Sequence, residues 1–281
     1  MTALTPFEQR DGRWFKREDL HRSTTGVNGA KYRACQFLVG EAERAGATAV
    51  TTAASVRSPQ HAIVATVAAE YGLPSYHVVG ATHPTAARKH VSVRTAMGLG
   101  AQFHYIGCAY NASLQPAAER LRVDIPGAYM VHYGITTPPG ASPSDIRRFA
   151  EVGAAQVENM PEEITELAVP FGSANSATGV LLGLSRLRRP PRVHLMGIGP
   201  DRRKWCRERL ASIGADVSRL TVEHHDLTTR YRYSDTVKAS ASGIRLHGTY
   251  EAKVWRWLSD ERPDWFRRER GAGLWIVGGP L

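Results

Sequence analysis

Short apolar segments with the composition of β-strands alternate with segments of helical spacing along most of this chain. We predict strands at residues 48–52, 75–79, 102–105, 166–169, 193–198 and 274–277. We predict helices at residues 62–71, 86–98 and 180–184. Such alternation is typical of parallel sheets whose strands are joined by crossover helices. The predicted fold class is therefore α/β.

The length and one connecting segment predict two domains. A chain of 281 residues usually forms one large or two modest domains. A Pro/Gly/Ser-rich connection, TTPPGASP, occupies residues 136–143 and is typical of a domain boundary. We expect a small domain at residues 47–146 and a large domain that joins residues 1–46 with residues 147–281.

Composition points to a cytoplasmic enzyme. The chain is 42% apolar, and its longest apolar stretches fall short of the ~20 residues of a membrane span. We see no basic region followed by an apolar run at the start, so we expect no signal peptide. Cys35, Cys108 and Cys206 are widely separated and lack the spacing of metal ligands, which favours reduced thiols and predicts no metal site.

Lys31 lies where a turn of small residues leads into a predicted helix, in the segment VNGAKYR. Tyr32, Phe37 and Leu38 give that helix an apolar face. Partial removal of water keeps an amine neutral, and a neutral amine can form a Schiff base. Lys31 is therefore a candidate for covalent chemistry, although a solvated lysine in a first helical turn has the same local pattern.

The segment AVPFGSANSATG at residues 168–179 has the pattern of a strand, a loop of small residues and a helix. In such a loop, backbone N–H groups and hydroxyls can converge on an anion at the positive end of the helix dipole. The loop is a candidate phosphate site, and plain turn chemistry is the alternative.

These segments occur together with three others in an order found in a known enzyme family. The others are FKREDL at residues 15–20, residues 51–61 and residues 243–253. The set resembles the tryptophan synthase β-type (fold type II) pyridoxal-phosphate enzymes, especially the branch of 1-aminocyclopropane-1-carboxylate deaminase and D-cysteine desulfhydrase. The resemblance implies a two-domain α/β fold with pyridoxal 5'-phosphate in the cleft between domains, and a homodimer.

The resemblance also implies roles for single residues. Lys31 would carry the cofactor as an internal aldimine, and Ser58 would lie near the substrate. Tyr250 would face the substrate as a phenol that transfers a proton or acts as a nucleophile. Glu251 would keep the pyridine nitrogen protonated, which strengthens the ring as an electron sink. The predicted cofactor-binding residues are Lys31, Gly172, Ser173, Ala174, Asn175, Ser176, Ala177, Thr178 and Glu251.

Two departures from the family pattern leave one contact unassigned. Ala30 stands where the family usually has asparagine, and Pro59 replaces the asparagine that commonly binds the cofactor's ring oxygen. Asn28 and Asn175 are the candidates for that contact. The terminal residues 274–281 resemble the family's stretch near the pyridine edge without its threonine.

The charge is unusual for an enzyme of free amino acids. The net charge is +10, with basic clusters at residues 186–192 and 202–209 and arginines among aromatic residues over 255–270. Such a surface attracts polyanions, and aromatic side chains beside arginines can stack on bases. Solvated helix faces in an arginine-rich protein are the alternative.

We predict a pyridoxal-phosphate-dependent lyase or deaminase that acts on the amino group of an amino acid through Lys31. Elimination, deamination and retro-aldol cleavage are all compatible with that cofactor. One alternative explains both the cofactor chemistry and the positive net charge. In it, the amino acid is attached to a nucleic-acid base, as in bacteriophage DNA hypermodification. A third interpretation is a basic nucleic-acid-binding protein that has kept the fold without catalysis.

Overall fold

A computed structural model describes residues 3–108, 110–266 and 271–280, which form two compact units. The large unit consists of Met1–His21 and Pro143–Pro280, and the small unit of Arg22–Ser142. Residues 22–46, which we expected in the large domain, group with the small one. The reason is helix α1 (Ala30–Arg44), which packs on α2 (Gln60–Glu70) and on β6 (Ala128–Val131).

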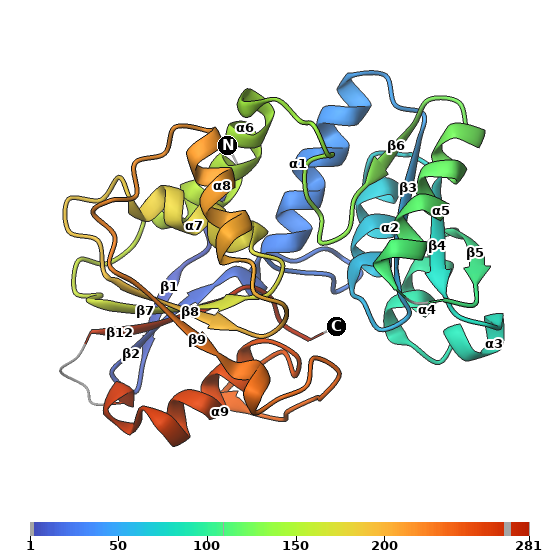
Figure 1. Cartoon of the computed structure of the whole chain (residues 1–281). Helices are drawn as coiled ribbons and strands as arrows, with labels where there is room; N and C mark the ends of the chain where they lie inside the picture. Colours follow the sequence, from blue (N-terminus) through green and yellow to red (C-terminus); the bar gives the residue numbers. More distant parts are fainter. Residues whose placement is uncertain (1–2, 109, 267–270, 281) are drawn as a thin grey trace. The chain divides into compact units, whose positions relative to one another are not determined.

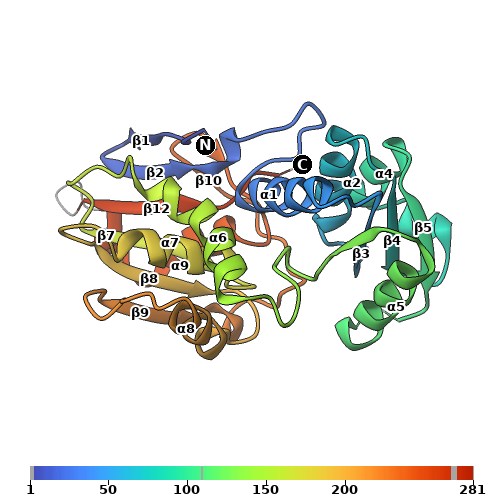
Figure 2. The same cartoon turned by 90° about the horizontal axis from the view of Figure 1, so that it is seen from above.

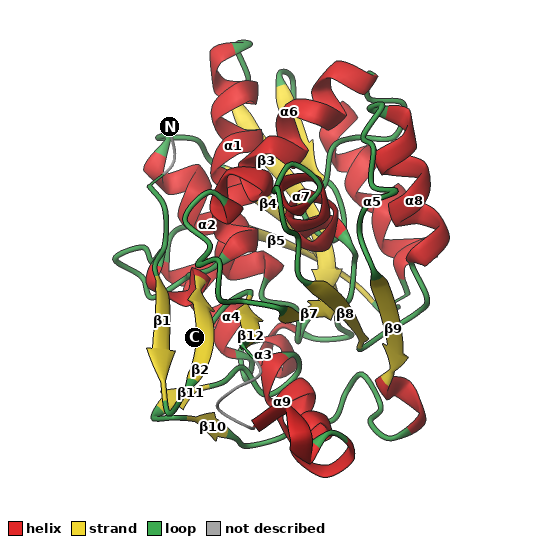
Figure 3. Cartoon of the chain, turned by 90° about the vertical axis from the view of Figure 1, so that its left-hand side faces the viewer, coloured by secondary structure: helices red, strands yellow, loops and turns green. Residues whose placement is uncertain are grey.

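The large unit contains a sheet with the strand order β1-β2-β12-β7-β8-β9 (Figure 3). Its strands are β1 (Phe7–Arg10), β2 (Arg13–Arg17), β7 (Glu166–Phe171), β8 (Arg192–Gly197), β9 (Val222–Asp226) and β12 (Ala272–Ile276). The β1–β2 pair is antiparallel and the other pairs are parallel. The last strand, β12, lies between β2 and β7 in the middle of this sheet, whereas the first strand, β1, forms one edge.

Helices cover both faces of that sheet. In Figure 1, α6 (Pro143–Ala154), α7 (Asn175–Leu184) and α8 (Arg203–Ser212) lie on one face, and α9 (Glu251–Glu261) lies on the other. Helices α6 and α7 are in close contact, since a Cβ atom on Gly179 would lie 2.8 Å from the carbonyl oxygen of Ala150. The smaller elements are η1 (Glu18–Leu20), η2 (Ala155–Val157), η3 (Leu227–Thr229), β10 (Ser240–Ala241), β11 (Ile244–Arg245) and η4 (Pro263–Phe266).

The small unit contains a parallel sheet with the order β5-β4-β3-β6. The strands besides β6 are β3 (Ala49–Ser55), β4 (Ser75–Gly80) and β5 (Gln102–Ile106). In Figure 2, α1, α2 and α4 (Val91–Gly98) lie on one face of this sheet and α5 (Asn111–Asp124) on the other. Helix α2 is buried along most of its length, from Gln60 to Ala68.

These elements confirm the predicted α/β class with parallel sheets flanked by helices. One predicted helix is wrong as a continuous element: residues 86–98 form the end of α3 (Pro84–Ala87) and then α4. The helix is interrupted because His90 has an extended backbone, with φ −91° and ψ 129°. Within the described residues, no helix is long and apolar enough to cross a membrane.

Candidate functional site

Lys31 is the second residue of α1, in the small unit. The helix begins after Gly29, whose φ of 91° lies in the region that favours glycine. The turn before it is buried at Val27, Asn28 and Gly29, and the Asn28 side-chain amide donates to the carbonyl of Gly26 at 2.9 Å. The Lys31 side chain itself is half-buried. A fixed, buried turn therefore positions a lysine that is only partly exposed.

Ser58 lies in the loop between β3 and α2, also in the small unit. It is half-buried, and its Oγ accepts a hydrogen bond from the backbone N–H of Gln60 at 3.2 Å. Gln60 and His61, at the start of α2, face inward. The Gln60 amide donates to Thr52 Oγ1 at 2.8 Å, and His61 Nδ1 lies 3.1 Å from His77 Nδ1. Ser58 is thus the member of this motif whose side chain stays on the loop.

The predicted phosphate loop joins β7 to α7 in the large unit. Ala174, with a φ of 67°, turns the chain into the helix, which begins at Asn175. First-turn N–H groups of a helix have no acceptor within the helix, so this end can receive an anion. Thr178, the last of the predicted phosphate residues, is buried, and its hydroxyl donates to the carbonyl of Ala174 at 2.9 Å. That hydroxyl therefore supports the turn that presents Gly172 to Ala177.

Glu251 is the first residue of α9 and is fully buried. Its Oε1 accepts hydrogen bonds from the backbone N–H groups of Val277 at 2.8 Å and Gly278 at 3.2 Å. Its Oε2 is also buried and has no hydrogen-bond partner among the described residues. Burial raises the pKa of this carboxyl group to about 8. A buried carboxylate oxygen in this state is suited to a donor supplied by a bound molecule.

Tyr250 brings two of the predicted motifs together within the large unit. A Cβ atom on Gly172 would lie 3.7 Å from the Tyr250 ring, so the phosphate loop and the start of α9 are neighbours. The Tyr250 hydroxyl lies 2.9 Å from that of Tyr233, and the ring of His247 lies 5.0 Å from its own. The sequence did not single out Tyr233, which belongs to no recognised motif, and it assigned no role to His247, although His247 lies in the segment 243–253.

Two other lysines near the motifs have structural roles. Lys16 is fully buried, and its Nζ donates to the carbonyl of Thr5 at 2.7 Å and to Asn159 Oδ1 at 2.8 Å. Lys253 donates to the carbonyls of Arg232 at 2.8 Å and Tyr233 at 3.2 Å. These bonds hold both amines against the protein, and neither lysine occupies the turn before α1 that carries the candidate Lys31.

The basic clusters are only partly neutralised. Arg186 pairs with Glu151, and Arg203 pairs with Asp201. Four exposed arginines of these clusters make no ion pair with another residue that the structure describes: Arg188, Arg189, Arg202 and Arg207. Three arginines of the aromatic-rich stretch, Arg267, Arg268 and Arg270, lie outside the described residues. The large unit therefore carries excess positive charge around the start of α8 and the loop before β8.

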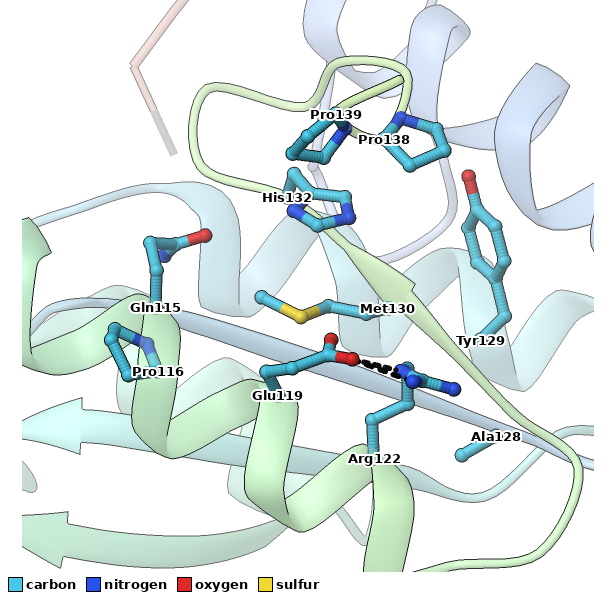
Figure 4. A pocket seen from close by; sticks show the side chains of 10 residues that line it. All are labelled: Gln115, Pro116, Glu119, Arg122, Ala128, Tyr129, Met130, His132, Pro138 and Pro139. Carbon is cyan, nitrogen blue, oxygen red and sulfur yellow. Dashed lines mark hydrogen bonds and ion pairs between the residues drawn. The ribbon is translucent and has the colours of Figure 1, made fainter. Parts of the chain in front are cut away.

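A surface pocket of about 600 Å³ lies in the small unit, apart from the motifs (Figure 4). It is lined by Gln115, Pro116, Glu119, Arg122, Ala128, Tyr129, Met130, His132, Pro138 and Pro139. Glu119 and Arg122 pair across one side at 2.5 Å, and burial raises the pKa of Tyr129 to about 12. This pocket could not be predicted from the sequence, because its walls come from α5, β6 and a loop that share no sequence motif.

Comparison with known proteins agrees with this arrangement. The chain is 30% identical to an O-seryl-dTMP PLP-dependent decarboxylase of Salmonella phage ViI, in an alignment that covers 94% of this chain and 77% of that protein. Its fold is similar to that of an ACC deaminase homologue, with a TM-score of 0.75 and 20% identity over 99% of this chain and 89% of that one. Threonine deaminase isoform 2 from Solanum lycopersicum gives a TM-score of 0.63 and 14% identity over 99% and 84%.

The match to a family covers most of the chain. Residues 2–263 match the family described as pyridoxal-phosphate dependent enzyme. The resemblance drawn from the sequence motifs is thereby confirmed, as is the enzyme class. The chain belongs to the pyridoxal-phosphate dependent enzymes of fold type II, with pyridoxal 5'-phosphate as its cofactor.

Proposed function

We propose that this enzyme is a lyase that removes the carboxyl group from an amino acid joined to a pyrimidine nucleotide. The observation that carries the proposal is the 30% identity, over 94% of the chain, with the phage enzyme named for O-seryl-dTMP. A net charge of +10 supports an anionic substrate, because a free zwitterionic amino acid gives such a surface little to attract.

The large unit has groups that fit pyridoxal phosphate. The buried Oε2 of Glu251, which lacks a partner among the described residues, matches the N–H group of a protonated pyridine ring. The N-terminus of α7 and the small residues Gly172 to Ala177 fit the phosphate. We propose that these groups hold the cofactor at both ends. When bound, the cofactor withdraws electrons from the substrate carbon next to the amino group.

The small unit supplies the reacting amine in this proposal. Lys31 would bind the cofactor covalently through Nζ and release it when the substrate amine takes its place. Breaking the bond to the carboxylate then releases carbon dioxide and leaves an electron pair on the substrate carbon. That carbon needs one proton, which the Nζ of Lys31 or the hydroxyl of Tyr250 can donate. Ser58 would position the substrate from the loop before α2.

Tyr250 is proposed to work as a pair with Tyr233. The two hydroxyls lie 2.9 Å apart, so one phenol donates to the other and fixes its orientation. Because the Tyr250 ring also adjoins Gly172, its hydroxyl belongs to the same part of the large unit as the phosphate loop. This placement supports a role in proton transfer or in substrate positioning.

The test compares two substrates with the holoenzyme. O-seryl-dTMP and free serine are supplied in parallel reactions, and mass spectrometry follows the loss of carbon dioxide from each. We expect kcat/KM for free serine to be lower by at least about 100-fold, since the nucleotide supplies binding energy that orients the reacting carbon. Efficient turnover of free serine with no change in the nucleotide would instead favour a lyase or deaminase of free amino acids.

A matched pair of lysine variants controls the experiment. Lys31→Ala should abolish the reaction on both substrates, because the amine that binds the cofactor is lost. Lys89→Ala removes an exposed lysine of the small unit that lies outside the basic clusters, and should retain the parent rate. Equal rates in the two variants would refute the role proposed for Lys31.

A further inference from the structure

Three potential metal ligands meet on one face of the large unit's sheet, at the pair formed by β8 and the edge strand β9. His194 lies opposite Glu223 in the register of these strands, and His225 follows Glu223 by two residues. Residues two apart on a strand share a face, so all three side chains project to the same side. His194 lies toward the middle of β8, and Glu223 and His225 lie beside it on β9. The phosphate loop, in contrast, follows the end of β7.

The distances among their ligand atoms suit a metal ion. His194 Nδ1 lies 3.0 Å from His225 Nε2 and 3.6 Å from Glu223 Oε2, and the latter two atoms are 3.9 Å apart. A point equidistant from the three atoms is about 2.1 Å from each, which matches the zinc bond lengths of about 2.0–2.2 Å to imidazole and carboxylate. A cation there would touch all three ligands without movement of the strands.

Neighbouring groups orient two of the ligands. The other oxygen of Glu223, Oε1, accepts from Arg192 at 2.5 Å, which leaves Oε2 on the histidine side. The other nitrogen of His194, Nε2, lies 3.3 Å from Glu166 Oε2, which is within ion-pair distance but outside hydrogen-bond geometry. In metal sites a carboxylate behind the second nitrogen of a ligating histidine fixes the ring and its tautomer, and Glu166 is near enough to take this role when His194 binds a metal.

Aromatic side chains pack against both imidazoles. His194 is 1% exposed and meets the indole of Trp265 edge to face at 5.0 Å, and His225 lies 4.9 Å from the ring of Trp257. Glu166 and Glu223 balance the nearby charges of Arg192 and Arg262.

We propose that His194, Glu223 and His225 bind a divalent transition metal of the zinc type, with water completing the coordination. One imidazole comes from β8, and the other two ligands come from β9, so the ion would fasten the edge strand to the sheet. This role is structural and independent of the reaction at the cofactor. It adds a metal site that the chain's cysteine spacing had not suggested.

The test uses the holoenzyme freed of metals by a chelator. Titration with Zn²⁺ in a calorimeter should give one site per chain, and Co²⁺ should produce the visible absorption of a low-symmetry site at the same stoichiometry. The thermal midpoint should rise with added Zn²⁺. His225→Ala should weaken binding by at least about 10-fold, and Glu166→Gln should weaken it by about 10-fold through the orientation of His194.

His224→Ala is the control, because His224 lies between two of these ligands on β9 and faces the other side of the sheet, against Phe171. It should bind Zn²⁺ like the parent. Since loss of the buried His194 could impair folding, His225→Ala and Glu223→Gln are the deciding variants. A folded parent that shows no Co²⁺ spectrum, or a His225→Ala variant that binds Zn²⁺ as tightly as the parent, would overturn the proposal.

Discussion

The two units hold their proposed functional groups in different ways. In the large unit, Glu251 is fully buried, and two backbone N–H groups hold one of its oxygens. In the small unit, Lys31 and Ser58 are half-buried at the starts of helices. Glu251, which we propose contacts the ring nitrogen, is thus part of the core of its unit, whereas Lys31 and Ser58 are partly exposed on theirs. Substitutions in the two units should therefore affect stability and turnover differently.

The largest effect is expected for Lys31→Ala, in the small unit. We expect kcat on the true substrate to fall by at least about 1000-fold, because the variant lacks both the covalent link and a proton carrier. The free energy of unfolding of the apoenzyme should change by no more than about 0.5 kcal/mol, since the side chain is half-buried. Steady-state kinetics and urea unfolding measure the two quantities. A large loss of stability with modest loss of rate would contradict the contrast between the units.

In the large unit, Glu251→Gln should retain the cofactor but change its absorption spectrum. A neutral amide holds the pyridinium proton less firmly than a carboxylate, so we expect kcat to fall by about 100-fold. Stopped-flow absorbance should show that the steps which place negative charge on the substrate carbon are slowed. An unchanged spectrum and rate would mean that Glu251 is not the partner of the ring nitrogen.

Glu251 should also make the stability of the apoenzyme depend on pH. Burial raises the pKa of Glu251 to about 8, above the ordinary value of about 4.3 in an unfolded chain. The native state therefore keeps a proton that the unfolded state loses as pH rises through this window. We expect the contribution of Glu251 to the unfolding free energy to fall by up to about 4 kcal/mol between pH 4 and pH 8.

Urea unfolding of the apoenzyme and of Glu251→Gln across that pH range isolates this contribution, because the other titrating groups are common to both proteins. The difference in unfolding free energy should change steadily in favour of the glutamine variant as pH rises. Parallel curves would show that the buried carboxyl group titrates normally.

A smaller effect is expected for Tyr250→Phe. It should lower kcat by about 10-fold or more and leave cofactor affinity unchanged, because the hydroxyl faces Tyr233 and not Glu251. Tyr233→Phe is the matched variant, which removes the partner hydroxyl and retains that of Tyr250. If Tyr250→Phe weakened cofactor binding more than turnover, Tyr250 would belong to the groups that hold the cofactor.

The smallest effect is expected at the arginines of the surface. Replacing Arg188, Arg189, Arg202 and Arg207 with glutamine should lower kcat/KM for the nucleotide substrate by a few-fold at low salt, with little change at high salt. The rate with free serine should not change. Equal losses for both substrates would indicate a structural defect, and no loss for either would separate the surface charge from substrate recognition.

The predictable part of the fold followed from local patterns. The predicted strands near residues 48–52, 75–79 and 102–105 are confirmed. They were predictable because each apolar run is flanked by turns. Lys31 was correctly expected at a helix start, where a turn of small residues gives a local signal.

The pairing of strands that are far apart in the sequence could not be predicted from local sequence patterns. The position of β12 between β2 and β7 depends on pairing across the whole chain, which no short pattern specifies. The inward direction of Thr178 depends on the left-handed turn at Ala174, and the burial of Gln60 depends on its contact with the end of β6. These features set which motif residues can meet a ligand, and only the folded chain reveals them.

The most direct test of the account is to reduce the holoenzyme with borohydride and map the pyridoxyl group by peptide mass spectrometry. Reduction makes the link between lysine and cofactor permanent, so the modified peptide identifies the amine. If Lys31 carries the cofactor, a single adduct on Lys31 is expected. An adduct on Lys16 or Lys253, or a holoenzyme that yields no adduct, would contradict this role of Lys31.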